Sequence, residues 1–108
     1  MNNLGEMLKQ AQEMQARMAD MQADMERREV SGGAGAGMLE LTLNGKGQMR
    51  RVKIDPALMQ SSNAEMLQDL IVAAHNDAKS KLDEIQAEEM SKLTGGLPLP
   101  PGFKMPFG

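Results

Sequence analysis

The chain has 108 residues, room for one small domain, and its composition removes several classes of chemistry. It contains no cysteine, which excludes disulfides and thiolate metal sites, and its single histidine, His75, cannot form a two-histidine metal site. The formal net charge of −3 argues against a generic basic nucleic-acid binder, and no apolar run is long enough to cross a bilayer. We therefore expect a cytoplasmic binding protein rather than an enzyme, with no cofactor, metal, membrane or small-molecule substrate.

The first predicted element is a helix over about residues 3–28. Its apolar residues alternate between spacings of three and four, the heptad pattern of a helix that packs along another helix. This seam consists of Leu4, Met7, Ala11, Met14, Met18, Met21 and Met25. Because most other positions are polar, we expect a second helix to cover the seam along its length. The alternative is an open, methionine-lined groove, which requires that no helix cover the seam.

Strands are predicted over the next part of the chain. The glycine-rich run 30–37 suits a twisted strand and a turn, and residues 39–44 then alternate between leucine and polar side chains. Asn44-Gly45-Lys46-Gly47 is typical of a hairpin turn, and residues 48–55 form the returning strand. Two registers stay open: a two-residue loop places Glu40 opposite Arg51, and a four-residue loop places it opposite Lys53.

A second helix is predicted to open at the capping-box sequence Ser62-Asn63-Ala64-Glu65 and to continue to about residue 93. It is the natural partner for the seam of the first helix. Its apolar face consists of Leu67, Leu70, Ile71, Ala74, Ala78, Leu82 and Ile85.

The predicted fold class is α+β. The order is α-β-β-β-α, with a three-stranded antiparallel sheet and two long helices in a single domain over residues 1–94. Both helices are too long for so small a sheet to cover, which predicts an obligate homodimer. Residues 95–108 hold four of the five prolines and both phenylalanines, and they are predicted to form an extended tail. Its apolar residues either dock on a partner or on the dimer, or form a frayed end.

Positive charge is concentrated in residues 27–54, which carry a local charge of +4, whereas the rest of the chain carries −7. A polyanion would be steered to this segment. We expect Arg50, Arg51 and Lys53 to contact DNA phosphates, supported by Arg27, Arg28 and Lys46. Two alternatives remain: these cations serve only cross-strand charge pairing, or DNA instead contacts cations on the two long helices. Those helical cations are Lys9, Arg17, Lys79 and Lys81.

The motifs, taken in order over nearly the whole chain, resemble the YbaB/EbfC family of bacterial nucleoid-associated proteins. They include Met7-Leu8-Lys9-Gln10-Ala11-Gln12-Glu13-Met14, Arg50-Arg51-Val52-Lys53-Ile54-Asp55-Pro56 and Leu99-Pro100-Pro101-Gly102-Phe103-Lys104-Met105-Pro106-Phe107. The resemblance implies a homodimer whose helix pairs project like the arms of tweezers from a central sheet. It also implies DNA binding that alters DNA conformation, gene regulation, and a role in nucleoid organisation. The alternative is a dimeric protein-binding module that uses its helical arms and tail, with incidental DNA contact.

Overall fold

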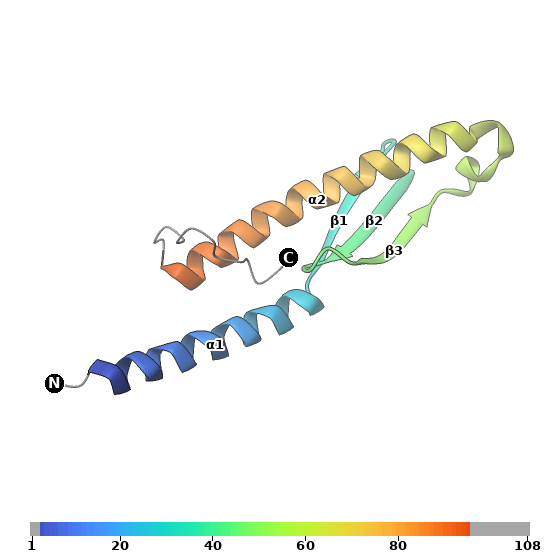
Figure 1. Cartoon of the computed structure of the whole chain (residues 1–108). Coiled ribbons are helices and arrows are strands. Elements are labelled where there is room, and N and C mark those ends of the chain that lie inside the picture. The colour runs from blue at the N-terminus through green and yellow to red at the C-terminus, as the bar shows by residue number, and fades with distance from the viewer. Residues whose placement is uncertain (1–2, 96–108) are drawn as a thin grey trace.

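The computed structural model describes residues 3–95 and has the predicted element order (Figure 1). Two long helices, α1 (Asn3–Arg27) and α2 (Ala64–Thr94), accompany a three-stranded antiparallel sheet. In spatial order the strands are β1 (Glu29–Ala34), β2 (Leu39–Asn44) and β3 (Met49–Ile54), and two short 3-10 helices (Pro56–Met59 and Ser61–Asn63) lead into α2. The predicted α-β-β-β-α fold is confirmed. Residues 96–108 of the predicted tail lie outside the described residues.

The core lies between α2 and the sheet, and α2 packs mainly on β1 and β2. Ala74, Ala78 and Leu82 of the predicted apolar face are buried there against the leucines of β2. The closest approach is at Gly32 of β1, where an added Cβ would overlap backbone atoms of Ala74 and Ala78. Glycine at this position therefore sets the distance between helix and sheet.

Side chains of α2 also occupy the outer edge of β1. The Asp77 carboxylate accepts a hydrogen bond from the Gly33 N–H at 3.1 Å and another from Lys81 Nζ at 3.2 Å. Lys81 Nζ in turn donates to the Ser31 carbonyl oxygen at 3.3 Å. The Gly33 N–H, followed by Lys81, holds the pKa of Asp77 below its ordinary value.

The β2–β3 register is the one that a four-residue loop produces, with Glu40 opposite Lys53 and Leu41 opposite Val52. The register shifts by one residue near the hairpin, so Arg50 is the extra residue of a β-bulge. Because opposed residues of an antiparallel pair point to the same face, Val52 shares the α2-facing side of the sheet with Leu41. The helix does not extend over β3, so Val52 stays 43% exposed and Met49 53% exposed.

The hairpin between β2 and β3 is joined to the end of α1. The Asn44 side chain orders the turn, because its Oδ1 accepts hydrogen bonds from the N–H groups of Lys46 and Gln48 at 3.0 and 2.9 Å. The Gly45 N–H then donates to the Met25 carbonyl oxygen at 2.7 Å. An added Cβ on Gly45 would overlap the backbone of Met25, so the two segments are in direct contact.

Most of the predicted seam of α1 has no covering helix. Met21 and Met25 are buried, but Leu4 and Met7 are 68% and 64% exposed, and Met14 is also exposed. The prediction that the second helix covers the seam along its length is therefore wrong. The apolar face of α2 packs on the sheet, and α2 meets α1 near the C-terminal turns of α2. The rest of α1 therefore projects outward (Figure 1). The radius of gyration is 19.3 Å, against about 13 Å for a compact domain of this length.

The predicted capping box does not form. The residue that precedes α2 is Asn63, whose side chain makes no capping hydrogen bond, and Ser62 lies within the second 3-10 helix. Asn63 Nδ2 donates instead to the Ala57 carbonyl oxygen at 3.0 Å. The chain thus enters α2 directly from a 3-10 turn, which shifts the helix start beyond the predicted capping residue.

Candidate nucleic-acid interface

The six predicted DNA-contacting cations fall into two groups. The junction group surrounds the point where the β2–β3 hairpin meets the end of α1, and the outer-face group lies on the side of the sheet away from α2. Arg27, Arg28, Lys46 and Arg50 form the junction group, and Arg51 and Lys53 form the outer-face group.

The backbone and side chain of Glu26 organise the junction group. Lys46 Nζ lies 3.6 Å from a Glu26 carboxylate oxygen, and the Arg50 guanidinium donates to the Glu26 carbonyl oxygen at 3.2 Å. That carbonyl belongs to the last turn of α1, where backbone oxygens lack helical partners and carry partial negative charge. Arg50 therefore stabilises the helix end and stays exposed.

The other two junction cations pair with carboxylates of the helices. Arg27 lies 2.6 Å from Asp24, and Arg28 lies 3.4 Å from Glu89 near the end of α2. Asp24, Glu26 and Glu89 thus lie against the cations of a segment whose own charge is +4 and offset part of that charge. The basic segment is weaker in the structure than in the sequence.

In the outer-face group, Arg51 makes a bidentate ion pair with Glu29 at 3.0 and 2.8 Å. The two residues belong to the two edge strands, so their pair spans β2, where Arg51 lies opposite Thr42 and Glu29 opposite Asn44, both of which are buried. The hydrogen bonds from Arg51 hold the pKa of Glu29 below its ordinary value, and the same contact raises the pKa of Arg51. Arg51 is therefore engaged within the sheet.

Lys53 lies near the other end of β3, beside a hollow of about 320 Å³ that Glu40 and Asp55 also line. Neither carboxylate is within ion-pair distance of its ammonium group; Asp55 accepts the Ala57 N–H at 2.9 Å instead. Of the six predicted residues, Arg50 and Lys53 are the two that form no ion pair within residues 3–95. Both are exposed on β3 and can bind a phosphate without breaking a carboxylate contact.

The helical arms offer phosphate a less favourable surface. Lys79 pairs with Asp83 and Lys81 with Asp77, whereas Lys9 and Arg17 of α1 form no ion pair in the described part of the chain. The helix α1 carries five carboxylates against three cations, and α2 carries seven against three. A phosphate backbone that lies along either helix would meet net negative charge.

The Glu29–Arg51 pair predicts an acid-sensitive contribution to stability. Because the folded-state pKa of Glu29 is depressed, its contribution is present above the ordinary value of 4.5 and is lost as the pH falls through the folded-state pKa. We expect Glu29→Gln to flatten the decline of the urea midpoint below pH 4.5, by a small amount because the pair is exposed. Glu40→Gln is the matched control, since Glu40 forms no ion pair with a described residue; equal flattening in both variants would contradict the assignment.

Sequence reasoning missed the carboxylates that neutralise the junction group. Glu89 lies 61 positions from Arg28 along the chain, so no local spacing signals their contact. The other two carboxylates could have been found from the sequence. Asp24 and Arg27 have the i,i+3 spacing of a helical ion pair, and Glu26 is an acidic residue at the end of the predicted first helix.

Within residues 3–95, no helix combines the length and apolar character that a membrane span needs. The model of the YbaB/EbfC DNA-binding family matches residues 1–97. A nucleoid-associated protein of Paramagnetospirillum magneticum is 61% identical over 107 residues, and one of Granulibacter bethesdensis is 59% identical; each match covers 99% of this chain and all of the relative. A crystal structure of a Helicobacter pylori protein has the same fold, with a TM-score of 0.77 at 18% identity over 88% of this chain and all of that one. The chain belongs to the YbaB/EbfC DNA-binding family.

Proposed function

We propose that this protein binds DNA as a homodimer and alters its conformation, contributing to nucleoid organisation and gene regulation in the cytoplasm. The observation that carries the proposal is the pair of exposed cations on β3, Arg50 and Lys53, which form no ion pair with a described carboxylate. Membership of a DNA-binding family and the names of the nucleoid-associated relatives support it.

Phosphate contact is the chemistry that these side chains offer. Arginine binds phosphate through a planar set of donors and lysine as a point charge, and neither contact reads the base sequence. The paired cations Arg27, Arg28, Lys46 and Arg51 act in support, by exchanging a carboxylate for a phosphate where DNA approaches. A dimer presents the β3 patch, which consists of Arg50 and Lys53, twice at a fixed spacing. A duplex that contacts both copies must therefore conform to that spacing.

The uncovered side of β3 supports the homodimer. Met49 and Val52 expose apolar side chains on the same face as the core, where α2 leaves the sheet open. A second copy that covers this face would complete the apolar layer in the manner of an isologous interface. The tweezer-like arrangement then follows from the helices, since α1 already projects from the sheet in each protomer (Figure 1).

The proposal predicts that Arg50→Gln combined with Lys53→Gln weakens binding to duplex DNA by about tenfold. It also makes the negative slope of log affinity against log salt shallower, by about one for each phosphate that the variant no longer neutralises. The measurement is fluorescence anisotropy of a labelled duplex at several salt concentrations.

Two matched variants separate the β3 patch from other sources of charge. Lys79→Gln with Lys92→Gln removes the same charge from cations that already pair with carboxylates, and should change the affinity much less. Lys9→Gln with Arg17→Gln tests contacts along α1. Equal losses in all three variants would attribute binding to net charge alone, and a loss confined to the α1 variant would move the contacts to the arms.

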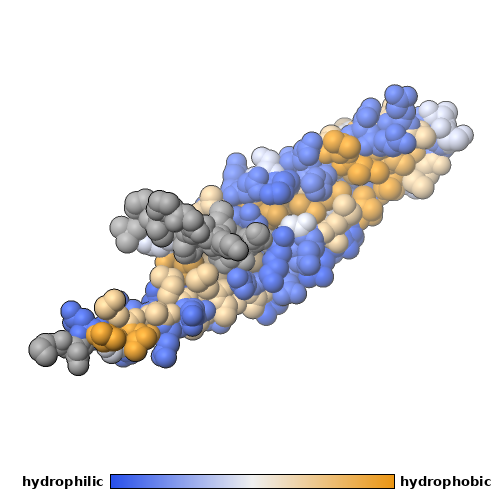
Figure 2. Space-filling view, viewed as in Figure 1, coloured by the Kyte–Doolittle hydropathy of each residue, from blue (hydrophilic) through white to orange (hydrophobic). Residues whose placement is uncertain are grey.

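A protein-binding module is the second candidate, and the exposed apolar end of α1 favours it. Leu4, Met7 and Leu8 are all more than half exposed, and Figure 2 shows apolar surface at this end of the molecule. If the β3 double variant keeps the affinity and salt slope of the unmodified protein, and so do the other two variants, DNA contact is incidental and this candidate is preferred.

A further inference from the structure

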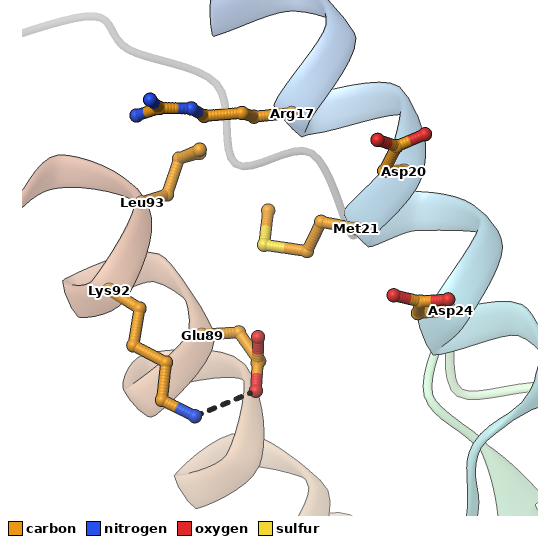
Figure 3. A pocket seen from close by; sticks show the side chains of 7 residues that line it. All are labelled: Arg17, Asp20, Met21, Asp24, Glu89, Lys92 and Leu93. Carbon is orange, nitrogen blue, oxygen red and sulfur yellow. Dashed lines mark hydrogen bonds and ion pairs between the residues drawn. The ribbon is translucent and has the colours of Figure 1, made fainter.

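A cleft lies between the C-terminal half of α1 and the last turns of α2 (Figure 3). Its volume is about 270 Å³. Met21 projects into it from α1, opposite Leu93 of α2, and charged side chains form its rim (Figure 3). The rim residues are Arg17, Asp20, Asp24, Glu89 and Lys92. The cleft thus has an apolar centre and a charged border.

The cleft continues along α1. Arg17 also borders a second hollow of about 320 Å³, which Gln10, Glu13 and Met14 line. Beyond it the seam residues Met7 and Leu4 stay exposed. The two hollows, which share Arg17, and the exposed seam residues beyond them therefore form a partly apolar track from the end of α2 along α1.

The chain that follows α2 starts at one end of this track. Gly95, two residues after Leu93 of the cleft, ends the helix in a left-handed conformation (φ 66°, ψ 24°). Its N–H donates to the Ser91 carbonyl oxygen. Thirteen residues follow, 96–108. At about 3.1 Å per residue in an extended, proline-rich conformation they can reach about 40 Å. The distance from Met21 to Met7 along α1 is only about 21 Å.

The composition of residues 96–108 fits the track. They contain large apolar side chains, four prolines, and Lys104 as the one charged side chain; the apolar residues are Leu97, Leu99, Phe103, Met105 and Phe107. Prolines reduce the number of backbone N–H groups that need partners in a groove and restrict the free segment, which lowers the entropy lost on docking. On the rim, Asp24 and Glu89 already have cationic partners, but Asp20 forms no ion pair with any described residue. Asp20 is therefore available to Lys104.

We propose that residues 96–108 dock on the α1–α2 cleft and the adjoining part of α1 in their own protomer, with Lys104 against Asp20. The segment would act as a strap that ties α1 to the end of α2. The proposal does not depend on DNA binding.

The absence of cysteine allows a direct test, because a spin label can be attached at one chosen position. In the full-length protein carrying Gly102→Cys, a nitroxide should broaden the ¹³C-methyl signals of Met14, Met18 and Met21 severalfold relative to the same sample with the nitroxide reduced. Met59, which ends the first 3-10 helix, and Met66, in the first turn of α2, lie far from the cleft and should not change. Equal signals at all five methionines, or broadening at the distant pair, would overturn the proposal.

Dilution distinguishes a protomer's own segment from that of a second copy. Spin-labelled, ¹³C-labelled chains are mixed with an excess of unlabelled chains, and broadening that persists supports docking within the protomer. Broadening that disappears on dilution assigns the segment to a partner and refutes docking in the same chain. Asp20→Asn should reduce the broadening severalfold, whereas Asp69→Asn, an exposed carboxylate on α2 far from the cleft, should not. If Asp20→Asn behaves like Asp69→Asn, the assigned contact with Lys104 is wrong.

Discussion

Replacing Gly32 with alanine should destabilise the protein by about 3 kcal/mol, at the upper end of the range for overpacking a core. The added Cβ would overlap backbone atoms of Ala74 and Ala78, and these atoms cannot move unless α2 moves away from the sheet. Such a shift would loosen the contacts that Leu41 and Leu82 make in the core. The entropy that alanine removes from the unfolded chain, about 0.4–1 kcal/mol, is too small to offset this loss.

Urea unfolding at a fixed protein concentration measures the effect, since self-association would otherwise change the apparent stability. Gly33→Ala is the matched control because it lies on the same strand, and its Cβ would meet only the Leu39 carbonyl oxygen at 3.5 Å, an ordinary contact. Equal destabilisation by both substitutions would show that close packing at Gly32 does not set the position of the helix.

Val52→Asp should convert the proposed homodimer to monomer at micromolar concentrations. The side chain is 43% exposed in the single chain, so the fold tolerates a carboxylate there. In a two-fold interface the substitution occurs twice, and it would bury two carboxylates without partners. We expect the dissociation constant to rise at least about 100-fold, which corresponds to about 2.7 kcal/mol.

Sedimentation equilibrium provides the measurement, and circular dichroism checks that the variant is folded. Val72→Asp is the control, because Val72 is 60% exposed on α2, away from the uncovered part of the sheet. A dimer that survives Val52→Asp, or that is lost equally with Val72→Asp, would place the interface elsewhere.

Local patterns in the sequence predicted the elements of the fold but not what covers them. The three-and-four spacing of the α1 seam identifies an apolar face correctly, and Met21 and Met25 are buried as expected. Whether another helix lies over Leu4 and Met7 depends on the direction of α2, and that direction is set by the packing of α2 on the sheet. The sequence likewise allowed two registers for the hairpin. The structure has Lys53 opposite Glu40, with a bulge at Arg50 that no local pattern predicts.

The sequence predicted which segment of the chain carries the cations of the candidate interface, but not which of those cations pair with carboxylates in the fold. The six cations are close together in the sequence, but the carboxylates that pair with them come from several elements. Glu29 reaches Arg51 across the sheet, and Glu89 reaches Arg28 from the far end of α2. These contacts depend on the completed fold, so the sequence could not distinguish Arg50 and Lys53 from their neighbours.

The contacts of Asp77 and Lys81 with β1 also limit how the sheet can extend. They occupy the outward N–H of Gly33 and the outward carbonyl of Ser31, so a further strand cannot pair there without displacing them. The remaining free edge is β3. Two chains that add strand to strand through β3 would close on each other and present no second open edge, which stops polymerisation into fibres at the dimer.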